Sequence, residues 1–145
     1  MIYQVIDKYD GVVIRLSKLE FEQGPSEYNL MITLSDREDG FVNQADRLLS
    51  AYHDYCSENL PFATPVFERY FLSDITNQQP LLEKMTESLP SNAVSIVEQP
   101  PLNGSKIALW AWLQTEVVNR NLYNGIFETN TGSSIHLRTA SEYET

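Results

Sequence analysis

Cysteine and long apolar runs are scarce in this sequence, and each shortage excludes a class of protein. Cys56 is the only cysteine, which excludes an internal disulfide and a cysteine-rich zinc site and fits a reducing compartment. No apolar run approaches the roughly 20 residues of a membrane-spanning helix. The first residues, MIYQVIDKYD, lack the basic and apolar regions of a signal peptide. We therefore expect a soluble, cytoplasmic protein with no membrane partner.

Basic residues are also few. The chain of 145 residues has 10 basic and 20 acidic side chains, and its formal net charge is −10 at pH 7. Binding to nucleic acid needs a basic stripe that neutralises phosphates, and none is visible, so we expect no nucleic-acid partner. The 42% of apolar residues is typical of a folded globular protein, and the length fits one domain.

Familiar catalytic and metal-binding motifs are absent as well. The sequence has no P-loop, no dinucleotide-binding glycine fingerprint, no nucleophile elbow and no His-Glu-x-x-His motif. His53 and His136 are far apart in the sequence. Each is better explained as a surface histidine, or as one with part of its hydrogen-bonding capacity satisfied, than as a metal ligand. Cys56 lies on an apolar helical stripe, which favours a buried small side chain over a nucleophile. We expect no metal site.

Hydrophobic periodicity predicts the element order β-β-β-α-β-α-β-β. Alternating or β-branched runs predict strands at Ile2–Ile6, Val12–Leu16, Glu27–Leu34 and Val66–Leu72. A capping-box pattern at Ser35 and Glu38 predicts a helix that continues to about Asn59. A second helix is expected over Asn77–Leu89 behind a Ser73-Asp74 cap, and its apolar stripe is expected to comprise Leu81, Leu82, Met85 and Leu89.

The stretch Val94–Leu113 is predicted to form two strands joined by a turn rich in proline, asparagine and glycine. The second of these strands is apolar on both faces, since Ala108, Trp110 and Trp112 alternate with its other apolar residues. Two helices on one face of a mixed sheet give an α+β sandwich. We therefore expect the second face to be an association surface.

Arg69 is an unusual residue, because it lies within an aromatic-rich strand. It could pair with a buried carboxylate such as Glu68 or Glu98, and this structural role has the greater weight. It could instead hold the carboxylate of a substrate bidentately.

Three local motifs resemble the Rid family, the reactive-intermediate deaminases also called YjgF-like or L-PSP proteins. They are the segments YFLSDI (residues 70–75), AVSIVEQPP (93–101) and KIALWA (106–111). The similarity covers roughly Ile2 to Leu113, so we expect a Rid-like domain over residues 1–113. Residues 114–145 are expected to be a C-terminal extension with short strands at Leu122–Phe127 and Ile135–Leu137.

The resemblance implies a chorismate-mutase-like fold, a homotrimer, and ligand pockets between subunits. Active members of the family hydrolyse 2-imino and enamine acids to 2-keto acids and ammonia without a metal or organic cofactor. In the family, an arginine in an Arg-Leu-Pro turn binds the substrate carboxylate, and an acid on the last strand positions water. The arginine position corresponds to Gln99 here and the acidic position to Trp110.

These departures leave the catalytic residues unassigned, and Arg69, Gln99 and Trp110 are the candidate ligand-binding residues. Three functions remain open. The first is an imine or enamine deaminase with a rebuilt pocket, in which Arg69 could replace the turn arginine. The second is a non-catalytic trimer that binds a small metabolite between subunits. The third is an interaction domain of a larger assembly, suggested by the long polar tail.

Overall fold

The computed structural model describes the backbone of residues 2–20, 24–35, 38–87, 93–115, 119–123, 126–130, 135–139 and 143–144, and side chains within these ranges up to residue 115. Its first eight elements follow the predicted order: β1 (Ile2–Ile6), β2 (Val12–Leu19), β3 (Glu27–Leu34), α1 (Phe41–Asn59), β4 (Thr64–Leu72), α2 (Ile75–Thr86), β5 (Ala93–Glu98) and β6 (Ile107–Gln114). They are followed by β7 (Asn119–Tyr123), β8 (Ile126–Asn130), β9 (Ile135–Thr139) and β10 (Tyr143–Glu144).

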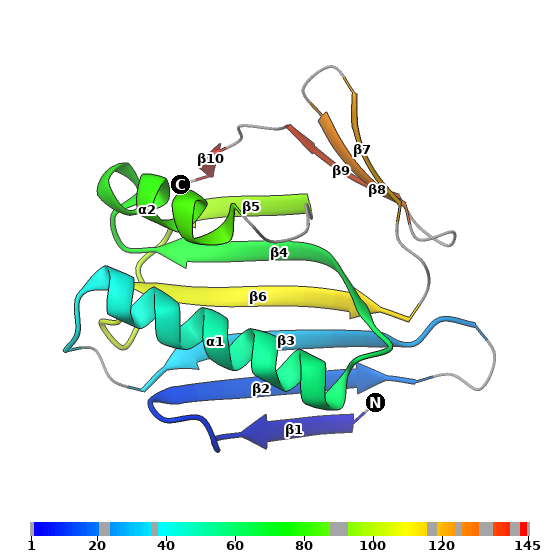
Figure 1. Ribbon diagram of the computed structural model, residues 1–145, viewed down its shortest axis with the longest axis horizontal. Coiled ribbons are helices and arrows are strands. Elements are labelled where there is room, and N and C mark those ends of the chain that lie inside the picture. Colours follow the sequence, from blue (N-terminus) through cyan, green and yellow to red (C-terminus); the bar gives the residue numbers. More distant parts are fainter. Residues whose placement is uncertain are drawn as a thin grey trace.

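The main sheet is mixed and has the strand order β1-β2-β3-β6-β4-β5-β10. β5 runs parallel to β4, and the intervening α2 makes the crossover that a parallel pair requires. β6 then returns between β3 and β4, antiparallel to both (Figure 1). The two strands within Val94–Leu113 therefore do not pair with each other, because β4 separates them.

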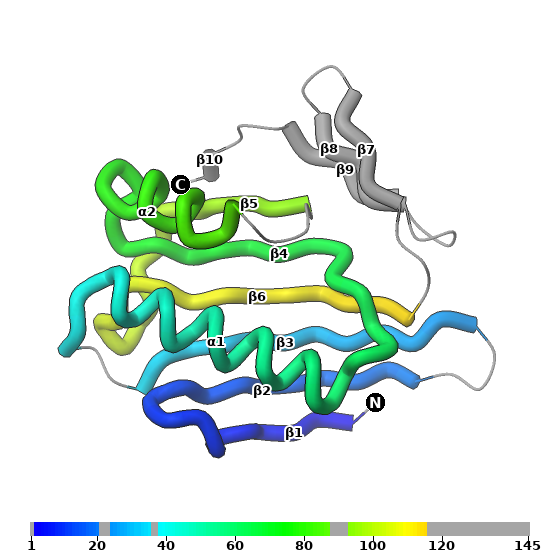
Figure 2. Tube along the Cα trace, in the orientation of Figure 1, coloured from blue at the N-terminus to red at the C-terminus, as the bar shows by residue number. Residues whose placement is uncertain are grey.

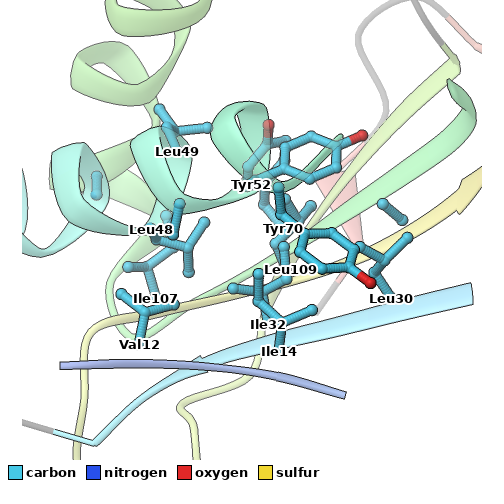
Figure 3. Packing of buried hydrophobic residues seen from close by; sticks show 14 of the residues in the cluster. Val12, Ile14, Leu30, Ile32, Leu48, Leu49, Tyr52, Tyr70, Ile107 and Leu109 are labelled. Atoms are coloured by element: carbon cyan, nitrogen blue, oxygen red, sulfur yellow. The ribbon is translucent and has the colours of Figure 1, made fainter. Parts of the chain in front are cut away.

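Both helices pack on the same face of this sheet, as the α+β prediction required (Figure 1). The Cα trace in Figure 2 shows that α1 crosses β2, β3 and β6, while α2 lies over β4 and β5. Between these layers lies one hydrophobic core, built from alternate residues of the strands and one stripe of α1 (Figure 3). Its fully buried members include Ile14, Leu16, Leu30, Ile32, Leu48, Ile107, Leu109 and Leu113.

The predicted capping box at Ser35 and Glu38 is wrong, because α1 begins after Gly40 and no side chain caps it. The apolar stripe of this helix starts at Phe41, which is buried against the core. Helices in proteins are held mainly by such packing, and a cap is worth only about 1 kcal/mol. The position of the stripe therefore decides where α1 begins.

The predicted cap of α2 is confirmed, since the Asp74 side chain accepts a hydrogen bond from the Asn77 backbone. Leu81, however, is 42% exposed, so its place on the apolar stripe was predicted wrongly. Gln78 explains the rotation of the helix. Its side chain donates to the Ser73 hydroxyl and accepts from the Asp74 backbone N–H, which turns the face containing Gln78 and Leu82 inward. Leu89 lies outside the described residues.

The predicted strand Leu122–Phe127 is wrong as a single element. β7 ends at Tyr123, β8 begins at Ile126, and the two pair antiparallel. The sequence between them is Asn-Gly, a dipeptide that is favoured in two-residue hairpin turns and that predicts two strands here in place of one. The second predicted strand, Ile135–Leu137, lies within β9.

Cys56 packs beside the core, as predicted, in a group of buried titratable side chains between α1 and β4. Burial, and secondarily the neighbouring Glu68 carboxylate, raise the pKa of the Cys56 thiol to about 12. The same two causes raise the pKa values of Tyr52 and Tyr70 well above the usual value. A thiol in this state is a poor nucleophile at neutral pH.

These shifts predict a loss of stability in alkaline solution. In the unfolded chain the thiol and phenols lose their protons near pH 9 and 10, whereas the folded chain retains them. The contribution of these protonated groups to the free energy of unfolding is therefore fully present below about pH 9 and is lost as the pH rises toward 12. Between pH 7.5 and 10.5 we expect the free energy of unfolding in urea to fall by about 2 kcal/mol through the Cys56 thiol alone, and further through the two phenols. Tyr52→Phe should reduce this loss, and an equal loss in that variant would contradict the assignment.

Candidate ligand-binding site

The sheet face opposite the helices carries an aligned row of side chains. The strand register places directly opposing residues of neighbouring strands on the same face. One row across six strands comprises Val5, Arg15, Met31, Trp110, Arg69 and Ser95. Three strand spacings separate Arg15 from Arg69, or about 14 Å. This surface, called the open face below, therefore carries two arginines with Met31 and Trp110 between them.

Arg69 lies among aromatic and polar neighbours on the open face. Its Nε donates to the Ser95 hydroxyl at 3.4 Å, and its guanidinium lies 5.4 Å from the centre of the Phe67 ring. Both carboxylates considered as partners also have neighbours of their own. Glu68, 7% exposed, lies beside Tyr52 on the helix side of the sheet, and Glu98 accepts a hydrogen bond from the Ile75 backbone at the start of α2.

Trp110 is half-buried at the centre of the open face. Its indole N–H donates to the Asn29 side-chain oxygen at 3.3 Å, and its ring centre lies 5.5 Å from that of Phe67. These contacts hold the indole over the sheet and satisfy its only donor. Trp110 thus contributes aromatic surface to this face.

An open pocket of about 500 Å³ lies at the end of the open face where the β5–β6 connection crosses it. Its floor comes from four strands and consists of Arg15, Met31, Thr33, Phe71 and Ala108. Its wall is the connection itself, Gln99–Pro100–Pro101–Leu102–Asn103. The predicted residue Gln99 lines this pocket, whereas Arg69 and Trp110 do not. Among the described residues the lining contains one cation and no carboxylate, and most of it is apolar.

The pocket wall is held in place by Asn103. Its amide nitrogen donates to the Leu34 carbonyl at the end of β3. Its amide oxygen accepts from the backbone N–H and the hydroxyl of Ser105, at 3.1 and 2.8 Å. Gly104 adopts a positive φ of 84° and donates to the Pro101 carbonyl, which closes the turn. The wall is therefore largely preformed, as in most small-molecule sites.

We expect Asn103→Ala to loosen this wall. The change removes three hydrogen bonds and leaves the Leu34 carbonyl and the Ser105 N–H without that partner, so the free energy of unfolding should fall by about 1–3 kcal/mol. Hydrogen exchange of the Gly104 and Ser105 amides should also accelerate. Gln99→Ala in the same connection is the matched control, because Gln99 is exposed and should leave both measurements nearly unchanged. Equal effects of the two variants would contradict the role of Asn103.

Arg15 is the residue that sequence reasoning missed. It is exposed, its Nη1 approaches the Thr33 hydroxyl at 3.4 Å, and it forms no ion pair with any residue whose side chain is described. The signal was present in the sequence, because Val12, Ile14 and Leu16 alternate toward the core and leave Arg15 on the other face. Only the register of β2 against β3 together with the path of the β5–β6 connection, however, brings Arg15 and Gln99 to one pocket.

Within the described side chains, no group of three or more His, Cys, Asp or Glu residues could hold a metal ion. No helix in the described part of the chain is both long and apolar enough to cross a membrane. Comparison with known proteins gives no matching family model and no matching curated protein.

Proposed function

We propose that this protein is Rid-like and binds small 2-imino or 2-keto acids in the pocket beside the β5–β6 connection. The observation that carries the proposal is the position of Gln99 in the pocket lining. The resemblance assigns this residue to the turn whose arginine binds the substrate carboxylate in the family. A preformed, mostly apolar pocket with a few polar groups is the usual form of a metabolite site.

The proposal includes a homotrimer with the open faces turned inward and the pockets between subunits. Its support is the apolar character of the open face, where Tyr3, Val5 and Met31 are 61%, 55% and 38% exposed and Trp110 is half-buried. Apolar surface of this extent commonly marks an association site. Sedimentation should give the mass of three chains at micromolar concentration, and a monomer would contradict this part of the proposal.

Binding without turnover is favoured by the chemistry of the pocket lining. Hydrolysis of an imine adds water to the imine carbon, breaks the C–N bond and moves a proton to the departing ammonia. Such proton transfers are usually carried by a carboxylate or a histidine. The ten lining residues include neither, and the acidic position of the family is Trp110. We therefore propose a ligand-binding protein that has lost or replaced the deaminase reaction.

An imine-hydrolysis assay combined with ligand binding tests this function. 2-Iminopropanoate is generated in solution, and its loss is followed with the wild type, with Gln99→Arg, and without protein. We expect the wild type to match the protein-free rate while binding 2-keto acids in calorimetry. Faster imine loss with the wild type would identify a deaminase instead. Absence of binding to every imino and keto acid tested would reject the proposed function.

A further inference from the structure

The environment of Arg15 is unusual for a chain with this charge. Acidic residues outnumber basic ones by 20 to 10, so carboxylates are plentiful as partners for the cations of this chain. Lys8 and Arg47, for example, pair with Glu58 and Asp39. Arg15 instead faces a pocket whose lining, within the described part of the chain, includes no carboxylate. An unpaired guanidinium in such a place makes the pocket locally suited to an anion.

The hydrogen-bonding capacity of this pocket is largely unused. A guanidinium has five N–H donors, and among the described residues Arg15 makes one side-chain hydrogen bond, to the Thr33 hydroxyl. The exposed Gln99 amide has no hydrogen-bond partner among the described residues. Both side chains line the same cavity, so both can donate to one bound group.

The remainder of the lining is apolar. Met31, Phe71 and Ala108 form the floor next to Arg15, and Pro101 and the fully exposed Leu102 form the rim. This surface would remove water from an aliphatic or aromatic group but offers no charged partner for a second anionic group. The two halves of the pocket thus fit the two ends of an amphiphilic molecule.

We propose that Arg15 binds the carboxylate of a small monocarboxylic acid whose apolar remainder lies on Met31, Phe71 and Ala108, with the Gln99 amide as a second donor. This inference rests on the proposed function, and it names the anchoring residue and the ligand class. Arg15 lies on β2, in the floor of the pocket. It would supply the positive charge that the β5–β6 turn lacks, since that turn carries Gln99 in place of an arginine.

The test uses 4-methyl-2-oxopentanoate as the probe in titration calorimetry with the full chain. Arg15→Met removes the charge and keeps an apolar stem of similar length. Lys18→Met is the matched control, because it removes the same charge from the same strand on the opposite face of the sheet. Thermal unfolding of each variant confirms that it is folded, which we expect for Arg15→Met because this side chain is exposed.

We expect Arg15→Met to weaken binding of the probe tenfold to about a hundredfold, the usual value of charge-assisted hydrogen bonds. Lys18→Met should stay within twofold of the wild type. The neutral analogue 4-methyl-2-pentanone and the dicarboxylate 2-oxoglutarate should both bind at least tenfold more weakly than the probe. Equal binding by Arg15→Met and the wild type, or by the probe and its neutral analogue, would overturn the inference and leave the proposed function standing. If the wild type binds no imino or keto acid, the proposed function itself fails.

Discussion

Leu109→Ala is expected to lower the free energy of unfolding by about 3 kcal/mol. Leu109 is fully buried at the centre of β6, between β3 and β4, and packs beneath the helices (Figure 3). Its side chain is surrounded by other core residues, including Ile32 and Tyr70, which oppose it on the neighbouring strands. The cavity left by truncation cannot close without moving two strands, so the loss exceeds the transfer free energy of the deleted atoms alone.

Urea denaturation at pH 7.5 measures this effect, and Leu81→Ala is the control. Leu81 is the same residue type on the exposed side of α2, so its truncation should change the free energy of unfolding by less than about 0.5 kcal/mol. Similar values for the two variants would show that the core is not centred on β6.

Trp110→Glu is expected to dissociate the proposed trimer into folded monomers. The indole lies at the centre of the open face. If it were buried against other subunits there, it would contribute a large share of the binding free energy between them. A carboxylate at this position would be desolvated in the assembly, although in the monomer it would lie in water opposite Arg69. We expect the dissociation constant to rise at least about thirtyfold, as for truncation of an interface residue worth 2 kcal/mol.

Sedimentation velocity over a concentration series measures this dissociation, and circular dichroism checks that the fold persists. Val42→Glu makes the same change from an apolar to an acidic side chain at an exposed position of α1, on the helix side of the sheet. It should leave the assembly intact. Dissociation by both variants, or by neither, would contradict the assignment of the open face as the interface.

Local patterns in the sequence predicted most of the elements of this fold. The alternation in Glu27–Leu34 and the stripe of α1 each reflect one buried face, and the structure confirms both. The sequence does not reveal that β6 inserts between β3 and β4, because that pairing joins segments about 80 residues apart. The two wrong predictions for the helices have a similar origin. Contacts with the core, rather than the capping pattern, set the start of α1. The Ser73–Gln78 hydrogen bond, rather than the apolar pattern, set the buried face of α2.

The candidate site was predicted in part. Gln99 was singled out by the resemblance, and it lines the pocket. Arg15 could not be selected from the sequence, because its relation to Gln99 depends on the register of β2 against β3 and on the path of the β5–β6 connection. The roles of Arg69, Gln99 and Trp110 in ligand binding remain predictions, and Arg69 and Trp110 lie on the same face as the pocket.

The most direct test of the central claim, that the open face binds a small carboxylic acid, is an NMR titration. Backbone amide and arginine Nε–H signals of isotope-labelled protein are followed as 4-methyl-2-oxopentanoate is added. We predict saturable shifts at Arg15, Met31 and Thr33 and along Gln99–Asn103, including the Arg15 Nε–H, with little change in α1. Saturable shifts confined to the helix side of the sheet, or no shifts at millimolar ligand, would contradict it.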